Sequence, residues 1–126
     1  MVKKLFSYRG KSLEELRELS LAELATIMPA RIRRSLRRGL DRPKAAVIAA
    51  LEAGKVPRVQ AREMPVLPVM VGKLLKVHNG KEWVTLTVLP EMLGHMLGEF
   101  ALTRKKVVHS TPGIGATRST DALSVK

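Results

Sequence analysis

The chain has 126 residues and a formal net charge of +12, from 23 lysines and arginines against 11 aspartates and glutamates. It contains no cysteine, which excludes disulfides, thiolate metal sites and cysteine nucleophiles. Because a cationic excess of this size repels itself in the folded state, an anionic partner is expected, and RNA, DNA and an anionic membrane surface all fit the charge.

The length suits one compact domain with arms. The longest apolar runs fall well short of the roughly 20 residues that cross a bilayer. No apolar stretch of signal-peptide length follows the N-terminal lysines. We therefore expect a soluble, intracellular protein with no membrane among its partners.

Residues 1–11 are predicted to be a flexible basic arm. Two capping-box patterns follow, Ser12 with Glu15 and Ser20 with Glu23, in which each serine accepts from a helical amide and each glutamate reaches back. They predict short helices over residues 13–19 and 21–28. Neither helix is long enough to be stable alone, so both must dock on the rest of the chain.

A third helix is predicted between Pro29 and Gly39, with Ile32 and Leu36 as its narrow apolar seam. Arginines without an intervening acid cover the rest of this helix: Arg31, Arg33, Arg34, Arg37 and Arg38. Most charged runs are simply solvated, but like charges at these spacings repel one another. Contact with phosphate is therefore the favoured interpretation.

The next helix is predicted from a cap at Asp41 to about Ala53, with an apolar interior that indicates a core helix. A first, rather polar strand is predicted over residues 58–64. The stronger pair of strands, 74–78 and 82–89, flanks Asn79-Gly80, the preferred sequence of a type I′ hairpin turn. In the second of them the side carrying Val84, Leu86 and Val88 is expected inside, and Thr85 and Thr87 outside.

Pro90-Glu91 is predicted to open a helix in which Gly94 and Gly98 permit close approach to the sheet. The methionines beside them, Met92 and Met96, are expected to fill the core. After Phe100 the regular pattern ends, and a basic tail with little to bury follows. We expect this tail to become ordered only on a partner, at an entropic cost.

No motif points to catalysis. The histidines His78, His95 and His109 form no HxxxH pair, and both GxxxxGK[ST] and GxSxG are absent. No acids show a spacing suited to acid–base chemistry. We therefore expect no enzyme, no cofactor and no metal.

Aromatic side chains are few, with one Trp, one Tyr and two Phe. Proteins that hold single strands by stacking usually have more. Structured RNA, recognised through phosphates and shape, is therefore favoured, with His78 as a candidate for contact with a phosphate or a ribose hydroxyl.

Ordered blocks of residues then indicate a family. They are Arg34-Ser-Leu-Arg-Arg-Gly39, Val77-His-Asn-Gly-Lys81, Pro90-Glu-Met-Leu-Gly-His95, Leu97-Gly-Glu-Phe-Ala101 and Thr103-Arg104. Together, over roughly residues 31–118, they closely resemble the universal small-subunit ribosomal protein family number nineteen. The helical extension from Tyr8-Arg-Gly10 onward and Pro112-Gly-Ile-Gly-Ala-Thr117 are similar to its archaeal and eukaryotic branch, and an archaeal source is preferred.

The resemblance implies an α+β domain with a small antiparallel sheet of about three strands, packed with short helices, over residues 31–102. Residues 1–30 would then be a helical extension, and residues 103–126 an extended basic tail. The implied partner is 16S-type rRNA in the head of the small subunit, in the cytoplasm. The implied neighbour is the head protein of family number thirteen, and the tail is implied to reach toward the decoding region and tRNA.

Charge and resemblance together give the expected contacts. Those with rRNA are Arg31, Arg33, Arg34, Arg37, Arg38, Lys76, His78, Asn79, Gly80, Lys81, Arg104, Lys105 and Lys106. The tail residues expected near tRNA are His109, Gly113, Gly115 and Arg118.

Two alternatives remain from the residues alone. A general DNA- or chromatin-binding protein, with residues 31–38 as its arm, would share the charge but not the ordered blocks. A small enzyme acting on nucleic acid would need a catalytic constellation that the sequence lacks.

Overall fold

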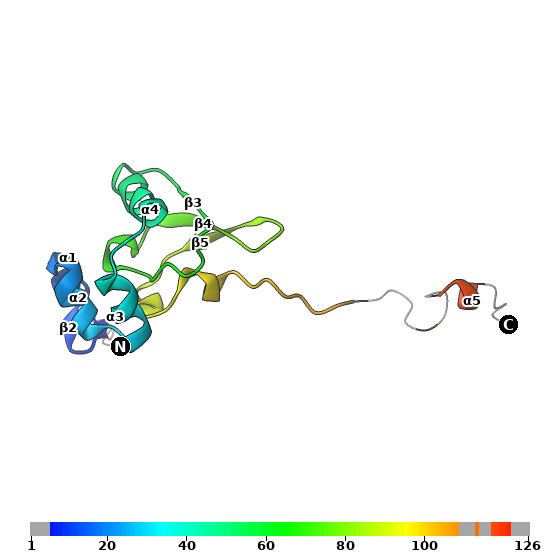
Figure 1. Ribbon diagram of the computed structural model, residues 1–126, viewed down its shortest axis with the longest axis horizontal. Coiled ribbons are helices and arrows are strands. Elements are labelled where there is room, and N and C mark those ends of the chain that lie inside the picture. The colour runs from blue at the N-terminus through cyan, green and yellow to red at the C-terminus, as the bar shows by residue number, and fades with distance from the viewer. Residues whose placement is uncertain (1–5, 109–112, 114–116, 122–126) are drawn as a thin grey trace, which may run out of the picture.

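The computed structural model describes residues 6–108, 113 and 117–121. Within this part of the chain the predicted α+β class is confirmed, because helices and a three-stranded sheet make up the folded body (Figure 1). Residues 102–108 leave the body as an extended segment (Figure 1). A short helix, α5 (Arg118–Asp121), is the last described element.

The two predicted N-terminal helices are confirmed as α1 (Leu13–Glu18) and α2 (Leu21–Ile27). Both capping boxes form, and in the first Glu15 Oε2 accepts the Ser12 N–H at 2.9 Å. Leu16 and Leu24 are buried in the core. Each short helix is thus closed by its own cap and held by one apolar side.

The basic arm predicted for residues 1–11 is corrected where the structure describes it. Strands β1 (Ser7–Tyr8) and β2 (Lys11–Ser12) pair antiparallel as a hairpin. Its turn residues Arg9 and Gly10 have φ of 49° and 82°, as a type I′ turn requires at both positions. The prediction was wrong here because Arg-Gly is not among the usual type I′ sequences.

The arginine-rich helix is confirmed as α3 (Ala30–Arg37), and Gly39 with φ of 87° follows its C-cap. Helix α4 (Arg42–Glu52) is also present, but it is not the core helix that its composition predicts. Only Lys44, Val47 and Leu51 are buried, all on one face. Four alanines lie among the residues that are not buried, because alanine favours helix without requiring burial.

The central sheet has the order β3–β4–β5. The predicted pair is confirmed as β4 (Leu74–His78) and β5 (Trp83–Thr87), antiparallel with Lys76 opposite Thr85. Strand β3 (Arg58–Val59) is shorter than predicted and pairs parallel with β4, so the sheet is mixed rather than antiparallel. On the side predicted to be inside, Val84 and Leu86 of β5 are half-buried and Val88, just after the strand, is buried, while Thr85 and Thr87 are exposed as predicted.

The turn between β4 and β5 is not the predicted type I′ turn. It spans residues 79–82, and Asn79 does not adopt a positive φ. Instead its side-chain Oδ1 accepts the N–H groups of Lys81 and Glu82 at 3.0 and 2.8 Å. Asparagine therefore shapes this turn with its side chain, in the manner of an Asx turn.

The helix predicted after Pro90 is replaced by two 3₁₀ turns, η2 (Pro90–Met92) and η3 (Leu97–Phe100). Between them Gly94 has φ of 86°, which stops a right-handed helix. Residues 95–98 instead run beside 62–66, through Val66 N–H to His95 O, Leu97 N–H to Met64 O and Gly98 N–H to Arg62 O. The glycines do permit close approach, but to Tyr8 and Arg62 rather than from a helix to the sheet.

The core lies beneath the inner face of the sheet, where Leu75, Val77 and Val88 are fully buried. Met64 and Met70 fill the space between this face and the helices, both with no exposed surface. A third 3₁₀ turn, η1 (Pro68–Met70), contacts both α1 and α4. No described helix is long and apolar enough to cross a membrane.

Gly94 offers a test of how the N-terminal hairpin docks. A Cβ built at Gly94 would lie 2.6 Å from the Tyr8 hydroxyl oxygen, whereas at Gly72, whose φ is 84°, it would meet nothing within 4 Å. Both Gly→Ala changes carry the left-handed backbone penalty of about 1–2 kcal/mol. We expect Gly94→Ala to cost about 1 kcal/mol more than Gly72→Ala in chemical denaturation, because Tyr8 must also move. Equal costs, or an excess that persists in a Tyr8→Ala background, would show that the hairpin does not pack there.

Candidate nucleic-acid interface

The arginines divide into those that bind the protein's own carbonyl groups and those that do not. Arg33 belongs to the first group, because its guanidinium donates to Ala25 O at 3.2 Å and to Thr26 O and Met28 O at 3.3 Å. These carbonyls lie at the C-terminal end of α2, which carries the negative end of the helix dipole. Arg33 was predicted together with its neighbours as an rRNA contact, and the structure instead directs it into the protein.

Arg62 is the second internal arginine, and the sequence patterns did not mark it. Its Nη1 donates to His78 O at 2.6 Å, and its Nη2 donates to Gly98 O at 2.7 Å and Ala101 O at 2.6 Å. One side chain thereby joins the end of β4 to η3 and to the residue where the tail begins. The one feature of the sequence that could have indicated this role is the position of Arg62, a cation just before the apolar run that starts at Met64.

Arg17 and Lys73 play similar parts. Arg17 Nη2 donates to Val71 O at 3.0 Å and ties α1 to the residue after η1. Lys73 Nζ donates to Leu51 O at 3.2 Å near the C-terminal end of α4. Part of the cationic excess is therefore used to satisfy carbonyl groups and is not available to a partner.

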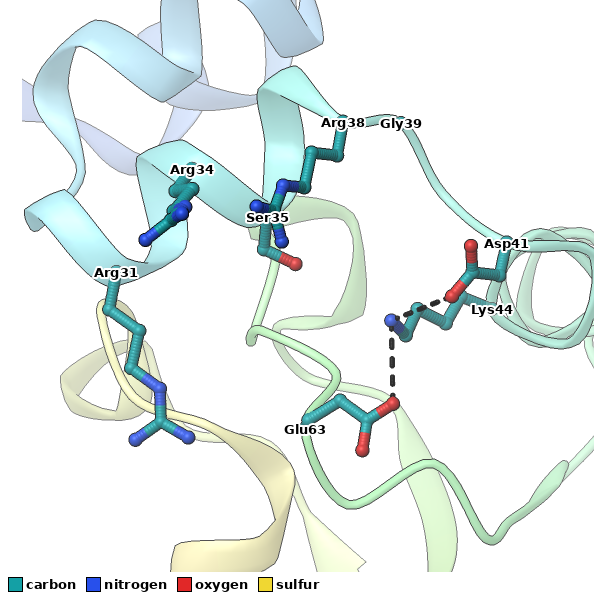
Figure 2. Close-up of a pocket in the computed structure, with 8 residues that line it drawn as sticks. All are labelled: Arg31, Arg34, Ser35, Arg38, Gly39, Asp41, Lys44 and Glu63. Carbon is teal, nitrogen blue, oxygen red and sulfur yellow. Dashed lines mark hydrogen bonds and ion pairs between the residues drawn. The ribbon is translucent and has the colours of Figure 1, made fainter.

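Three arginines of the second group line a cleft of about 560 Å³. Arg31, Arg34 and Arg38 project from one side of α3, with Ser35 between them (Figure 2). The opposite side is formed by Asp41 and Lys44 of the α4 N-terminus and by Glu63 (Figure 2). Arg37 does not line the cleft, although it too is exposed.

A buried lysine lies between the two acids of this cleft and balances one of their two charges. The Lys44 side chain is only 8% exposed, and its Nζ lies 3.2 Å from Asp41 Oδ2 and 3.6 Å from Glu63 Oε1. Asp41 therefore binds Lys44 and does not cap α4 as predicted. With four cations and two acids in its lining, the cleft keeps a net charge of +2, carried by the arginines of its α3 side.

Arg31 also affects a carboxylate at the edge of this region. The pKa of Glu99 is lowered, mainly by the N–H of Met96 and further by His95 and Arg31. His95 Nδ1 lies 2.6 Å from Glu99 Oε2. Arg31, Glu63 and Glu99 line a neighbouring hollow with Arg62.

The lowered pKa of Glu99 predicts a dependence of stability on pH. A carboxyl whose folded pKa is depressed stabilises the fold above its unfolded pKa, and this contribution is lost as the pH falls through the folded pKa. Lowering the pH from 7 to 3 should therefore reduce the denaturation midpoint less in Glu99→Gln than in the unchanged chain. Glu91→Gln, also an exposed glutamate of this region, is the control and should keep the full difference. An unchanged difference in Glu99→Gln would contradict the prediction.

In the predicted hairpin site, shape and charge come from different residues. Asn79 is buried and uses its Oδ1 in the turn, while His78 Nδ1 accepts the Gly80 N–H at 3.1 Å. Lys81 is exposed and Lys76 half-buried. His78 and Asn79 therefore shape the loop, and the two lysines present its charge.

The tail begins next to this loop. Lys105 Nζ lies 3.1 Å from Glu82 Oε1, which lowers the pKa of Glu82. Arg104 and Lys106 are exposed, as are Gly113 and Arg118. His109 and Gly115 fall outside the described residues. The start of the tail is thus tied to the hairpin through Lys105 and Glu82.

The outer face of the sheet holds two further residues that the sequence prediction missed. The Arg58 guanidinium lies 5.7 Å from the centre of the Trp83 ring, and His78 meets this ring edge-on with centroids 4.8 Å apart. Cross-strand register places Arg58, Lys76 and Thr85 in one row across the sheet. Among the described residues, no group of three or more His, Cys, Asp or Glu side chains is arranged to hold a metal.

The comparison with known families identifies the family of the chain. The family model of ribosomal protein S19 matches residues 31–109, from the cleft helix α3 through the sheet to the beginning of the tail. The match covers more than half of the chain, and it confirms the resemblance of the ordered blocks. The protein therefore belongs to the ribosomal protein S19 family, a structural, non-enzymatic family of the small ribosomal subunit that serves translation.

Proposed function

We propose that the protein binds 16S-type rRNA in the head of the small subunit, with the cleft between α3 and α4 as its main phosphate site. The observation that supports this most strongly is the set of three exposed arginines, Arg31, Arg34 and Arg38, which leave the cleft with a net positive charge after its two acids and Lys44 are counted. Guanidinium groups bind phosphate in bidentate geometry. Their spacing along α3 presents them as one row.

The mechanism is electrostatic. Lysines and arginines displace the counterions of crowded phosphates, which makes binding strongly dependent on salt. The folded platform recognises the shape of the RNA, as is usual for helical RNA. The hairpin lysines and Arg104 to Lys106 extend the cationic surface away from the cleft.

The finer assignments are part of the same proposal. The neighbouring protein in the head is the member of family number thirteen, and the tail beyond residue 103 reaches toward the decoding region and tRNA. The branch is the archaeal and eukaryotic one, which the resemblance of the extension containing α1 and α2 implies. The ribosome concerned is the cytoplasmic one.

Sedimentation tests the proposal in its simplest form. In a gradient at low salt the protein should travel with particles of small-subunit size, and it should be released as salt is raised. Protein that stays at the top of a low-salt gradient would contradict it. A general DNA-binding role predicts clear preference for duplex DNA over folded rRNA at matched salt, and we expect the reverse.

A further inference from the structure

A second hollow lies across the first turn of α4 from the cationic cleft. It has a volume of about 360 Å³ and is lined by Pro43 and Val47 of α4, by residues 58–61 and by Trp83. This volume is near the lower end of the range of about 300–1,000 Å³ for small-molecule sites, which suits one planar ring system. Pro43 lines this hollow and the adjacent Lys44 lines the cleft, so the two sites share one helical turn.

The lining combines an aromatic platform with polar groups at its margin. Trp83 is half-buried, with the Arg58 guanidinium over its ring. Gln60 is exposed at the same hollow, and its amide offers both a donor and an acceptor. Among the described lining residues there is no acid.

This combination fits a nucleobase better than an aliphatic side chain. Unpaired bases of RNA stack on aromatic rings and on arginine planes, and they are read by hydrogen bonds at their edges. Arg58 and Lys76, in neighbouring strands of the same sheet face, would meet the phosphates that flank such a base. An RNA strand whose phosphates bind in the cleft can therefore place one of its bases in the hollow on the other side of α4.

We propose that the hollow beside Trp83 receives one unpaired base of the small-subunit rRNA, stacked on the indole and contacted at its edge by Gln60. The inference rests on the proposed function, because it needs rRNA as the partner. It goes beyond that function in adding a stacking site to an interface otherwise made of phosphate contacts.

The single tryptophan of the chain makes the site directly observable. The full chain is titrated with a transcript of the head domain of 16S-type rRNA, and Trp83 emission is followed together with binding. Stacking should quench the emission in step with binding. Trp83→Leu should weaken binding at least about fivefold, while the slope of affinity against salt stays unchanged because no phosphate contact is lost. Trp83→Phe should keep most of the affinity.

The outcomes separate this inference from the proposed function. Salt-dependent binding with unquenched emission, and with equal affinity in Trp83→Leu, would overturn the stacked base and leave rRNA binding intact. Absence of binding by the unchanged chain would overturn both. Should Trp83→Leu fail to fold, as judged by circular dichroism, the emission of the unchanged chain and the loss of affinity in Gln60→Ala decide the matter.

Discussion

Replacing Arg62 by alanine is expected to lower the free energy of unfolding by about 3–4 kcal/mol, the largest effect of any single cation in the described chain. The change leaves the part-buried carbonyls of His78, Gly98 and Ala101 without their donor. An acceptor left unsatisfied costs about 1–3 kcal/mol, and less where water reaches it. Chemical denaturation of the RNA-free protein measures this loss directly.

Arg58→Ala is the matched control for Arg62→Ala. Arg58 lies four residues earlier, is exposed, and loses only its contact with Trp83, which is worth about 0.5–1 kcal/mol at such a site. Arg62→Lys should remain close to the alanine variant, because one ammonium group cannot reproduce the planar fork. If Arg62→Ala cost no more than Arg58→Ala, Arg62 would not be the tie between β4, η3 and the tail.

Replacing Arg31, Arg34 and Arg38 together by alanine should have the largest effect on RNA binding. Each lost phosphate contact lowers the slope of log affinity against log salt by about 0.7–0.9, so the slope should fall by about 2–3. The dissociation constant for the rRNA head domain should rise at least about tenfold at moderate salt. Binding titrations at several salt concentrations give both values.

A control variant for the role of the cleft is available on the same helix. Arg37 is exposed on α3 but does not line the cleft, so Arg37→Ala removes an equal charge from a different direction. Arg34→Ala should lower the salt slope more than Arg37→Ala does. Equal effects would mean that net charge alone determines binding and that the cleft is not a site.

Local signals in the sequence predicted much of the fold correctly. The serine–glutamate caps delimit α1 and α2, and the Ile32–Leu36 seam orients α3 so that Arg31, Arg34 and Arg37 are exposed. These features depend on residues within one or two turns of each other. Cap chemistry and helical periodicity can therefore be read without knowledge of the rest of the chain.

What the sequence did not predict depends on distant contacts. Arg62 and Gly98 are separated by 36 residues, and no local pattern identifies which carbonyls a guanidinium will find. The helix predicted after Pro90 fails because residues 95–98 find hydrogen-bond partners at 62–66. The candidate site shows the same limit, since charge alone could not separate Arg33, which binds α2, from Arg34, which faces the cleft.

Cross-linking of assembled small subunits tests the central claim most directly. Ultraviolet cross-linking followed by mass spectrometry identifies the peptides of this protein that touch rRNA. The account predicts cross-links from the cleft segment, residues 31–44, and from the hairpin at residues 76–83. Cross-links confined to α1 and α2, with none from the cleft segment, would contradict the assignment of the cleft as the rRNA site.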